Sequence, residues 1–238
     1  MLRSGRRYAE TLRLVTAMEN WLLDPPPAPR RRLPVPGRVG PGEGPGGWDR
    51  LTTAANGVTL ARTVVAVPLG LWALVLTSAP LLVLAYCVYW IGDIADGWLA
   101  RRRGEETRTG AVLDIVSDRA CSSVLVCGLM MLQPQLWPAL TVFLVQFMVV
   151  DCVLSLSFVR WPWLLSPNYF YRVDPAIYRL NWSPAAKAAN TAGVVLVVSA
   201  GHLPTALTVA LAQLAIKIWS AARLLSLAPG TEPIAPAS

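Results

Sequence analysis

Long apolar stretches alternate with short polar connections along the chain, after a polar segment that spans residues 1–50. The six apolar stretches cover residues 63–78, 81–99, 110–132, 136–159, 184–200 and 205–225. Each approaches the length of about 20 residues that a helix needs to cross the hydrocarbon core of a bilayer. The pattern predicts an all-α integral membrane protein, a bundle of six transmembrane helices with an N-terminal cytoplasmic extension.

Composition and charge agree with a membrane protein. Of the 238 residues, 54% are hydrophobic and 15% charged, which is too apolar for an ordinary soluble domain. The net charge of +7 could indicate nucleic acid or an anionic membrane surface. The basic residues flank apolar stretches and lack interleaved base-stacking aromatic residues, so the sequence does not favour a nucleic-acid partner.

The connections between the stretches are alternately bare and basic. Residues 77–80, 133–135 and 201–204 carry no lysine or arginine, whereas the other connections and the first fifty residues are rich in arginine. Because positively charged connections stay in the cytoplasm, both termini are expected there. We expect an integral membrane protein of the bacterial cytoplasmic membrane, with the carboxylate-bearing helix ends at the cytoplasmic face.

Three regions follow from these patterns. Residues 1–50 form a basic, Pro/Gly-rich cytoplasmic extension, in which residues 8–23 fit either an amphipathic surface helix or a tail with transient helix. Residues 51–227 form the six-helix transmembrane domain. Residues 228–238 are rich in proline and alanine and are expected to be a disordered tail.

Four carboxylates interrupt the second and third apolar stretches, at Asp93, Asp96, Asp114 and Asp118. Acidic side chains within a membrane are costly and indicate a functional site. Residues three or four apart share one face of a helix, so each pair lies on one face. A short polar link over residues 101–109 predicts an antiparallel helix pair whose acidic faces meet.

Oxygen ligands without histidine or cysteine favour Mg²⁺ or Mn²⁺ over zinc or copper. Two such ions would offset the repulsion among four carboxylates and clamp both oxygens of a phosphoryl displacement. Gly97 and Gly110 lack side chains beside the carboxylates, which leaves room for a phosphate ester. The alternative is that each aspartate is a separate ion-paired residue near a helix end. That alternative explains one such residue but does not explain four of them at this spacing. The residues therefore favour metal-dependent phosphoryl chemistry.

The pattern D-x2-D-G-x2-A-R-x8-G-x3-D-x3-D resembles the signature of the CDP-alcohol phosphotransferases. Its eight fixed positions are filled by Asp93, Asp96, Gly97, Ala100, Arg101, Gly110, Asp114 and Asp118. The resemblance implies a bundle of six transmembrane helices, a homodimer and a site at the cytoplasmic interface.

The resemblance also implies roles for these residues. Asp93, Asp96 and Asp114 would be metal ligands, and Asp118 would be the general base toward the acceptor hydroxyl, with some metal contact. The CDP moiety would lie along the remaining motif residues, with the diphosphate near the arginine. These CDP-binding residues are Gly97, Ala100, Arg101 and Gly110.

A second, shorter match precedes the first apolar stretch. Many family members carry P-N-x2-T-x2-R there, and this chain has A-N-G-V-T-L-A-R at residues 55–62. Asn56 is a candidate helix N-cap, with Thr59 and Arg62 on the inner face of the helix. Asn56 and Thr59 are assigned to the CDP site by this match. An ordinary capped helix start with an interfacial arginine is the alternative.

The resemblance implies transfer of a phosphatidyl group from CDP-diacylglycerol to an acceptor hydroxyl, with release of CMP. The segment K-A-A-N-T at 187–191 resembles an element of cardiolipin synthases and phosphatidylglycerophosphate synthases. Asp151 and F-V-R at 158–160 resemble the eukaryotic-type cardiolipin synthases. They favour phosphatidylglycerol as the acceptor, with glycerol 3-phosphate or inositol phosphate as alternatives.

Candidate acceptor-binding residues lie between the fourth and fifth stretches, because a phosphorylated acceptor needs cationic partners. They are Arg160, Arg179 and Lys187. An aromatic-rich anchoring loop with ordinary positive charge is the alternative interpretation of this region. Lys217, inside the last stretch, is expected to snorkel toward the interface rather than reach the site.

Two other classes compete with the enzyme. A cation- or proton-relay transporter would also use buried acids, but it needs no glycine, alanine and arginine pattern beside them. A silent membrane scaffold has no need of four intact carboxylates. The sequence therefore favours the transferase.

Overall fold

The computed structural model describes residues 51–190 and 201–228. Within these ranges the chain is helical and contains no strand. Five helical segments are long and apolar enough to cross a membrane. The all-α membrane fold is confirmed by these segments. The predicted fifth stretch is helical over residues 184–190 and then leaves the described part of the chain, as do the N-terminal extension and the tail.

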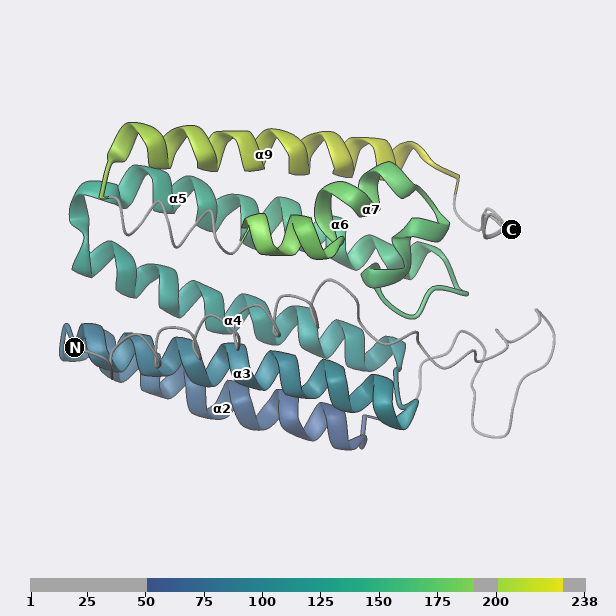
Figure 1. Cartoon of the computed structure of the whole chain (residues 1–238), viewed down its shortest axis with the longest axis horizontal. Helices are drawn as coiled ribbons and strands as arrows, with labels where there is room; N and C mark the ends of the chain where they lie inside the picture. Colours follow the sequence, from purple (N-terminus) through teal and green to yellow (C-terminus); the bar gives the residue numbers. More distant parts are fainter. Residues whose placement is uncertain (1–50, 191–200, 229–238) are drawn as a thin grey trace, which may run out of the picture. The chain divides into compact units, whose positions relative to one another are not determined.

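The first three spans are single helices, shown in Figure 1. They are α2 (Ala54–Val75), α3 (Ala79–Arg103) and α4 (Arg108–Leu132). The fourth span, Pro134–Arg160, consists of five shorter pieces: η1 (Pro134–Leu136), α5 (Trp137–Val145), η2 (Gln146–Asp151), α6 (Cys152–Leu156) and η3 (Ser157–Arg160). Of these pieces, η2 is π-helical. The last span is α9 (Leu203–Ser226).

The first span begins nine residues earlier than the hydropathy pattern predicts. Thr53 is its N-cap, because the Thr53 hydroxyl accepts the backbone N–H of Asn56 at 3.1 Å. The prediction that Asn56 caps this helix is wrong; its side-chain amide instead donates to the Leu51 carbonyl at 2.9 Å. The polar residues of the second sequence match therefore lie inside the first turns of α2.

The link between α3 and α4 is shorter than the predicted 101–109. Helix α3 continues through its three arginines and ends at Gly104, whose φ of 62° is the left-handed conformation that glycine adopts readily. Thr107 then caps α4 by accepting the Gly110 N–H at 2.9 Å. A four-residue turn, residues 104–107, thus joins the two helices that carry the aspartates.

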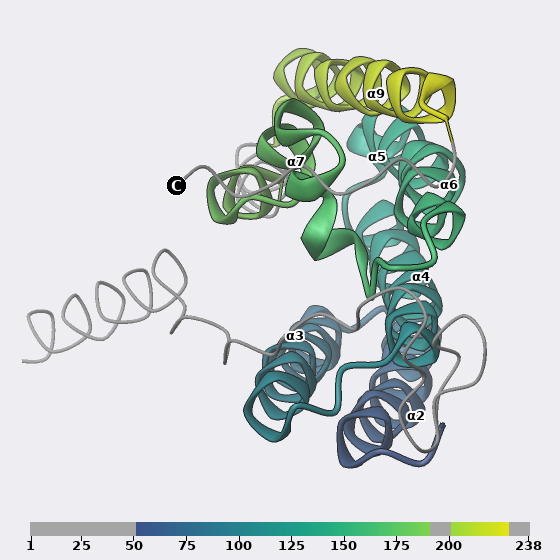
Figure 2. The same cartoon turned by 90° about the vertical axis from the view of Figure 1, so that its right-hand side faces the viewer.

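Helix α4 lies between two groups of helices. It contacts α2 and α3 on one side and the pieces of the fourth span on the other, while α5 and η2 pack on α9 (Figure 2). The outward face of α2 exposes large apolar side chains at helical spacing: Leu60, Val64, Leu71 and Val75. Such a face suits lipid contact, in agreement with a membrane-spanning helix.

The aromatic-rich segment after the fourth span folds against the helix ends. It contains η4 (Pro167–Arg172) and α7 (Pro175–Asn181), and we call residues 161–181 the connector. Trp161 and Phe170 are fully buried and meet edge to face with ring centroids 6.0 Å apart. Arg108, at the start of α4, donates to the Trp161 and Pro162 carbonyls. The connector is therefore largely a packed core that is fixed to α4.

Candidate active site

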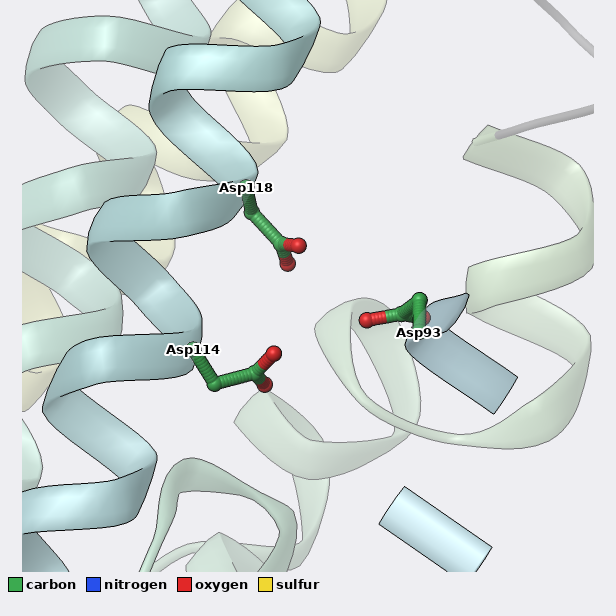
Figure 3. Close-up of side chains that lie close together, drawn as sticks. All are labelled: Asp93, Asp114 and Asp118. Atoms are coloured by element: carbon green, nitrogen blue, oxygen red, sulfur yellow. The ribbon is translucent and has the colours of Figure 1, made fainter. Parts of the chain in front are cut away.

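Three of the four predicted carboxylates converge between α3 and α4 (Figure 3). Asp93, Asp114 and Asp118 each offer an oxygen atom, and these atoms lie within 4.8 Å of one another. Ligand oxygens on opposite sides of one divalent cation are roughly 4 to 5 Å apart, so the spacing fits such an ion. The donors are all carboxylate oxygens, which suits Mg²⁺ or Mn²⁺.

The fourth carboxylate, Asp96, lies outside that group of three. It is 5% exposed, and it accepts a hydrogen bond from the Thr59 hydroxyl at 2.7 Å. Arg62 Nε lies 3.0 Å from the same Asp96 oxygen. The structure thus brings Asp96 together with α2 residues of the second sequence match, and its role as a metal ligand stays a prediction.

Arg62 forms ion pairs with all four carboxylates. Its guanidinium nitrogens lie 3.3 Å from Asp93, 3.0 Å from Asp96, 2.5 Å from Asp114 and 3.1 Å from Asp118. The Arg62 side chain is 2% exposed, whereas the side chains of Asp93 and Asp114 are 40% and 43% exposed, so the guanidinium is buried and the cluster opens to solvent on the side of these two aspartates. One guanidinium against four ionised carboxylates leaves three negative charges, which suits divalent cations.

The sequence interpretation placed Arg62 on the inner face of its helix but did not include it in the site. A cation on the inner face of an apolar helix, in a chain with four buried acids, is the signal that could have identified it. We call the four aspartates the carboxylate cluster, and Arg62 its guanidinium partner.

Glycines permit the close approach of the helices at the cluster. A Cβ at Gly110 would stand 2.7 Å from the Asn56 side-chain oxygen and 2.8 Å from the Thr107 hydroxyl. Gly110 therefore lets α2 pack against α4, in addition to any room it leaves for substrate. A Cβ at Gly97 would stand 3.2 Å from an Arg101 guanidinium nitrogen. The structure thus places two of the predicted CDP-binding residues, Gly97 and Arg101, side by side.

Ala100, the remaining CDP-binding residue predicted from the motif, lies in the last turns of α3. Its carbonyl accepts the Glu105 N–H at 2.9 Å, which helps to close the turn into α4. The predicted CDP-binding residues therefore come from two places, the end of α3 and the facing starts of α2 and α4.

The three candidate acceptor-binding residues have different surroundings. Arg160 donates to the Leu224 and Leu227 carbonyls, both at 3.0 Å, and so caps the C-terminus of α9. Lys187 donates to the Asn168 side-chain oxygen at 2.8 Å, and its charge interacts with the carboxylates of the cluster. Arg179 is exposed near the end of α7. Of the three, Lys187 is the residue whose charge interacts with the carboxylate cluster.

Lys217 does not snorkel toward the interface, and that prediction is wrong. It is 7% exposed, and its ammonium lies 2.5 Å from an Asp151 oxygen. A lysine whose carboxylate partner lies on a neighbouring helix is held inside the bundle by that ion pair, which hydropathy along the chain cannot show.

Comparison with known proteins identifies a family that matches this chain. Residues 52–221 match the family described as CDP-alcohol phosphatidyltransferase. A segment of 47 residues is 47% identical to a phosphatidylinositol phosphate synthase of Mycobacterium bovis, and equally to those of two strains of Mycobacterium tuberculosis. The segment covers 18% of this chain and 22% of each relative. No solved structure matches the chain.

The family match covers most of the chain and includes α2, α3, α4 and nearly all of the later described elements. The members of this family are transferases of substituted phosphate groups. The chain therefore belongs to the CDP-alcohol phosphatidyltransferase family.

Proposed function

We propose that this protein transfers the phosphatidyl group of CDP-diacylglycerol to the hydroxyl of an alcohol and releases CMP. The observation that carries the proposal is the meeting of Asp93, Asp114 and Asp118, whose oxygen atoms lie within 4.8 Å of one another between two apolar spans. Such a cluster suits a diphosphate substrate, because divalent cations bind carboxylates and phosphate oxygens together.

The residues divide the chemistry among them. Asp93, Asp114 and Asp118, with Asp96 as the fourth predicted ligand, would hold two Mg²⁺ or Mn²⁺ ions, which neutralise the diphosphate when bound. Arg101 faces the diphosphate from the end of α3. Asp118 accepts the proton of the acceptor hydroxyl. The acceptor oxygen attacks the phosphorus that bears the diacylglycerol, and the bond between this phosphorus and the CMP oxygen breaks.

The acceptor that the contacts favour is a phosphorylated soluble alcohol, with inositol phosphate first. The partial relatives are named phosphatidylinositol phosphate synthases, and Lys187 supplies a cation whose charge interacts with the cluster. Two of the residues that favoured phosphatidylglycerol have other partners. Asp151 pairs with Arg119 and Lys217, and Arg160 caps α9.

Phosphatidylglycerol and glycerol 3-phosphate are the competing acceptors. The K-A-A-N-T segment, which begins at Lys187, supports phosphatidylglycerol by its resemblance to cardiolipin synthases. We further propose a location in the bacterial cytoplasmic membrane, with the site and both termini on the cytoplasmic side, which the alternating charge of the connections supports. The resemblance to the family supports a homodimer.

An acceptor panel tests the proposal. Membranes with the full chain receive labelled CDP-diacylglycerol, Mn²⁺ or Mg²⁺, and one of inositol phosphate, glycerol 3-phosphate, phosphatidylglycerol or serine. CMP release that depends on inositol phosphate, requires the metal and falls by about 10²-fold or more in Asp118→Asn supports it. Dependence on another acceptor changes the substrate only. No release with any acceptor, or release unaffected by Asp118→Asn, rejects the mechanism and favours a transporter or scaffold.

A further inference from the structure

A second group of charged side chains is buried where α4, the fourth span and α9 meet. Asp151 uses one carboxylate oxygen for Arg119, at 2.6 Å, and the other for Lys217, at 2.5 Å. The three residues, which we call the buried triad, come from three spans, and each is 7% exposed. The carboxylate cluster contains none of them.

The buried triad is an expensive way to hold helices together. Two cations and one anion leave a net positive charge inside the bundle, and each ion loses its hydration there. Apolar side chains of similar volume stabilise a buried contact equally well or better. Stability alone therefore does not account for three charged residues at this position.

The position of Arg119 connects the triad to the proposed chemistry. Arg119 directly follows Asp118 on α4. Its guanidinium carbon lies 3.7 Å from the centroid of the Phe147 ring, and its nitrogen is bonded to Asp151. Because a helix turns as a unit, a rotation of α4 that moves Arg119 also moves Asp114 and Asp118 through the same angle.

The other side of the contact has an unusual backbone. Asp151 is the last residue of the π-helical segment η2, which also contains Phe147. A π-helical turn holds one residue more than an α-helical turn, and such turns occur frequently at functional sites. This segment presents Phe147 and Asp151 to Arg119, and the Ser155 hydroxyl of α6 lies 3.4 Å from the same Arg119 nitrogen.

We propose that the buried triad positions the catalytic carboxylates by fixing the rotation of α4. Asp151 and Phe147 hold Arg119 on one side of the helix, which orients Asp114 and Asp118 toward α3 on the other. Lys217 pairs with the second carboxylate oxygen of Asp151 and connects the contact to α9. The inference rests on the proposed function, because the residues that it orients are the predicted metal ligands.

Three variants of the purified full-length protein test this role: Asp151→Asn, Lys217→Met and the double variant. Mn²⁺ binding without substrates, kcat and KM for CMP release, and thermal stability are measured for each. Asp151→Asn leaves two cations unpaired, so we expect Mn²⁺ affinity and kcat to fall about tenfold or more, with each KM within about twofold. Lys217→Met keeps the Arg119 pair, and we expect a change of less than about threefold.

The double variant separates charge from packing. It carries one unpaired cation instead of two, so we expect it to recover part of the Mn²⁺ affinity that Asp151→Asn loses. Asp174→Asn is the matched control, because Asp174 is also a buried aspartate paired with an arginine, but in the connector. We expect it to lower the melting temperature and leave Mn²⁺ affinity unchanged.

The proposal is overturned if Asp151→Asn lowers only the melting temperature, as the control does. If Asp151→Asn does not fold, Asp151→Glu replaces it, because the longer side chain keeps the negative charge but displaces Arg119. Unchanged Mn²⁺ affinity in Asp151→Glu would then overturn the proposal. Because Mn²⁺ binding needs no acceptor, this result is independent of the acceptor panel. If the wild-type protein releases no CMP, the proposed function is rejected. The Mn²⁺ affinities of the variants would then still test whether the buried triad positions the carboxylates.

Discussion

Gly92 of α3 lies directly against the Arg62 side chain of α2. A Cβ at Gly92 would stand 2.5 Å from Arg62 Cβ and 2.8 Å from Arg62 Cδ. Real Cβ atoms do not approach other atoms this closely, so only glycine at position 92 leaves the path that Arg62 takes to the carboxylate cluster. This glycine lies one residue before Asp93 and outside the family signature.

Gly92→Ala should therefore displace Arg62 without removing its charge. We expect the stability to fall by about 1 to 3 kcal/mol, as for other overpacked sites, because the added methyl meets the near end of the arginine rather than its flexible tip. We expect CMP release to fall about tenfold, since the partner of all four carboxylates shifts. Thermal unfolding and initial rates with saturating Mn²⁺ measure the two effects.

The matched control is Gly57→Ala on the neighbouring helix α2, where a Cβ would meet nothing within 4 Å. We expect this exchange to leave CMP release unchanged and to stabilise the helix by up to about 1 kcal/mol. Equal rates for the two alanine variants would contradict the role given to Gly92.

Replacement of Arg62 itself should expose the repulsion within the carboxylate cluster. Arg62→Gln removes the cation that contacts all four aspartates, so we expect a lower melting temperature and a loss of CMP release of about 10²-fold. Asp93 and Asp114 are about two-fifths exposed, which limits the loss of stability because water screens them. We expect saturating Mn²⁺ to raise the melting temperature of Arg62→Gln more than that of the wild type.

Arg62→Lys keeps the positive charge but not the fork of the guanidinium. An ammonium is a compact charge and cannot reach four carboxylates as Arg62 does, so we expect an intermediate rate. The assignment fails if the Mn²⁺-induced rise in melting temperature is the same for the wild type, Arg62→Gln and Arg62→Lys.

The sequence predicts the spans and the convergence of the carboxylates because both depend on local spacing. The pairs Asp93/Asp96 and Asp114/Asp118 share helix faces whatever the rest of the chain does, and the short link brings the faces together. The ion pairs of Arg62 and Lys217 depend on partners in other helices. The hydropathy pattern predicts that Arg62 and Lys217 lie at the membrane interface. Both are buried because their partners are carboxylates on other helices.

The predicted start of the first span is wrong because it, too, depends on contacts with other helices. Residues 54–62 contain an asparagine, a threonine and an arginine, so an apolar stretch does not begin there. In the structure the Asn56 side chain donates to the Leu51 carbonyl, and Thr59 and Arg62 bond to Asp96, which lets α2 begin at Ala54. The role of Gly92 depends on the distance between α2 and α3, which no pattern within one helix contains.

Arg160 and Lys187 should separate a structural arginine from an acceptor-binding lysine. Arg160→Gln removes two charge-assisted hydrogen bonds to the end of α9, so we expect a loss of stability of about 1 to 3 kcal/mol. We expect its KM for the acceptor to stay within about twofold of the wild type. Thermal unfolding and acceptor titrations of CMP release provide both values.

Lys187→Gln should give the opposite result. Loss of one charge-assisted contact to a phosphorylated acceptor raises its KM about tenfold, while the KM for CDP-diacylglycerol and the melting temperature stay near those of the wild type. A raised acceptor KM in Arg160→Gln, with Lys187→Gln unaffected, would reverse the two assignments.

The contact between Asp174 and Arg223 should make part of the stability depend on pH. Burial alone would raise the pKa of Asp174, but a hydrogen bond from Arg223 and the backbone N–H groups of Ile177 and Ala176 outweigh it and lower the pKa below 3.8. A carboxyl whose pKa is lowered by folding stabilises the protein above its unfolded pKa. This stabilisation is lost as the pH falls through the folded pKa.

We therefore expect the wild type to melt at a higher temperature than Asp174→Asn near neutral pH. Because the Arg223 side chain is about half exposed, the difference corresponds to about 1 kcal/mol. We expect the difference to be constant down to about pH 4 and to shrink below it, since Asp174 then takes up a proton. Thermal unfolding of both proteins in detergent from pH 7 to pH 3 measures it. A difference that persists unchanged at pH 3 would show that Asp174 acts through packing and not through its charge.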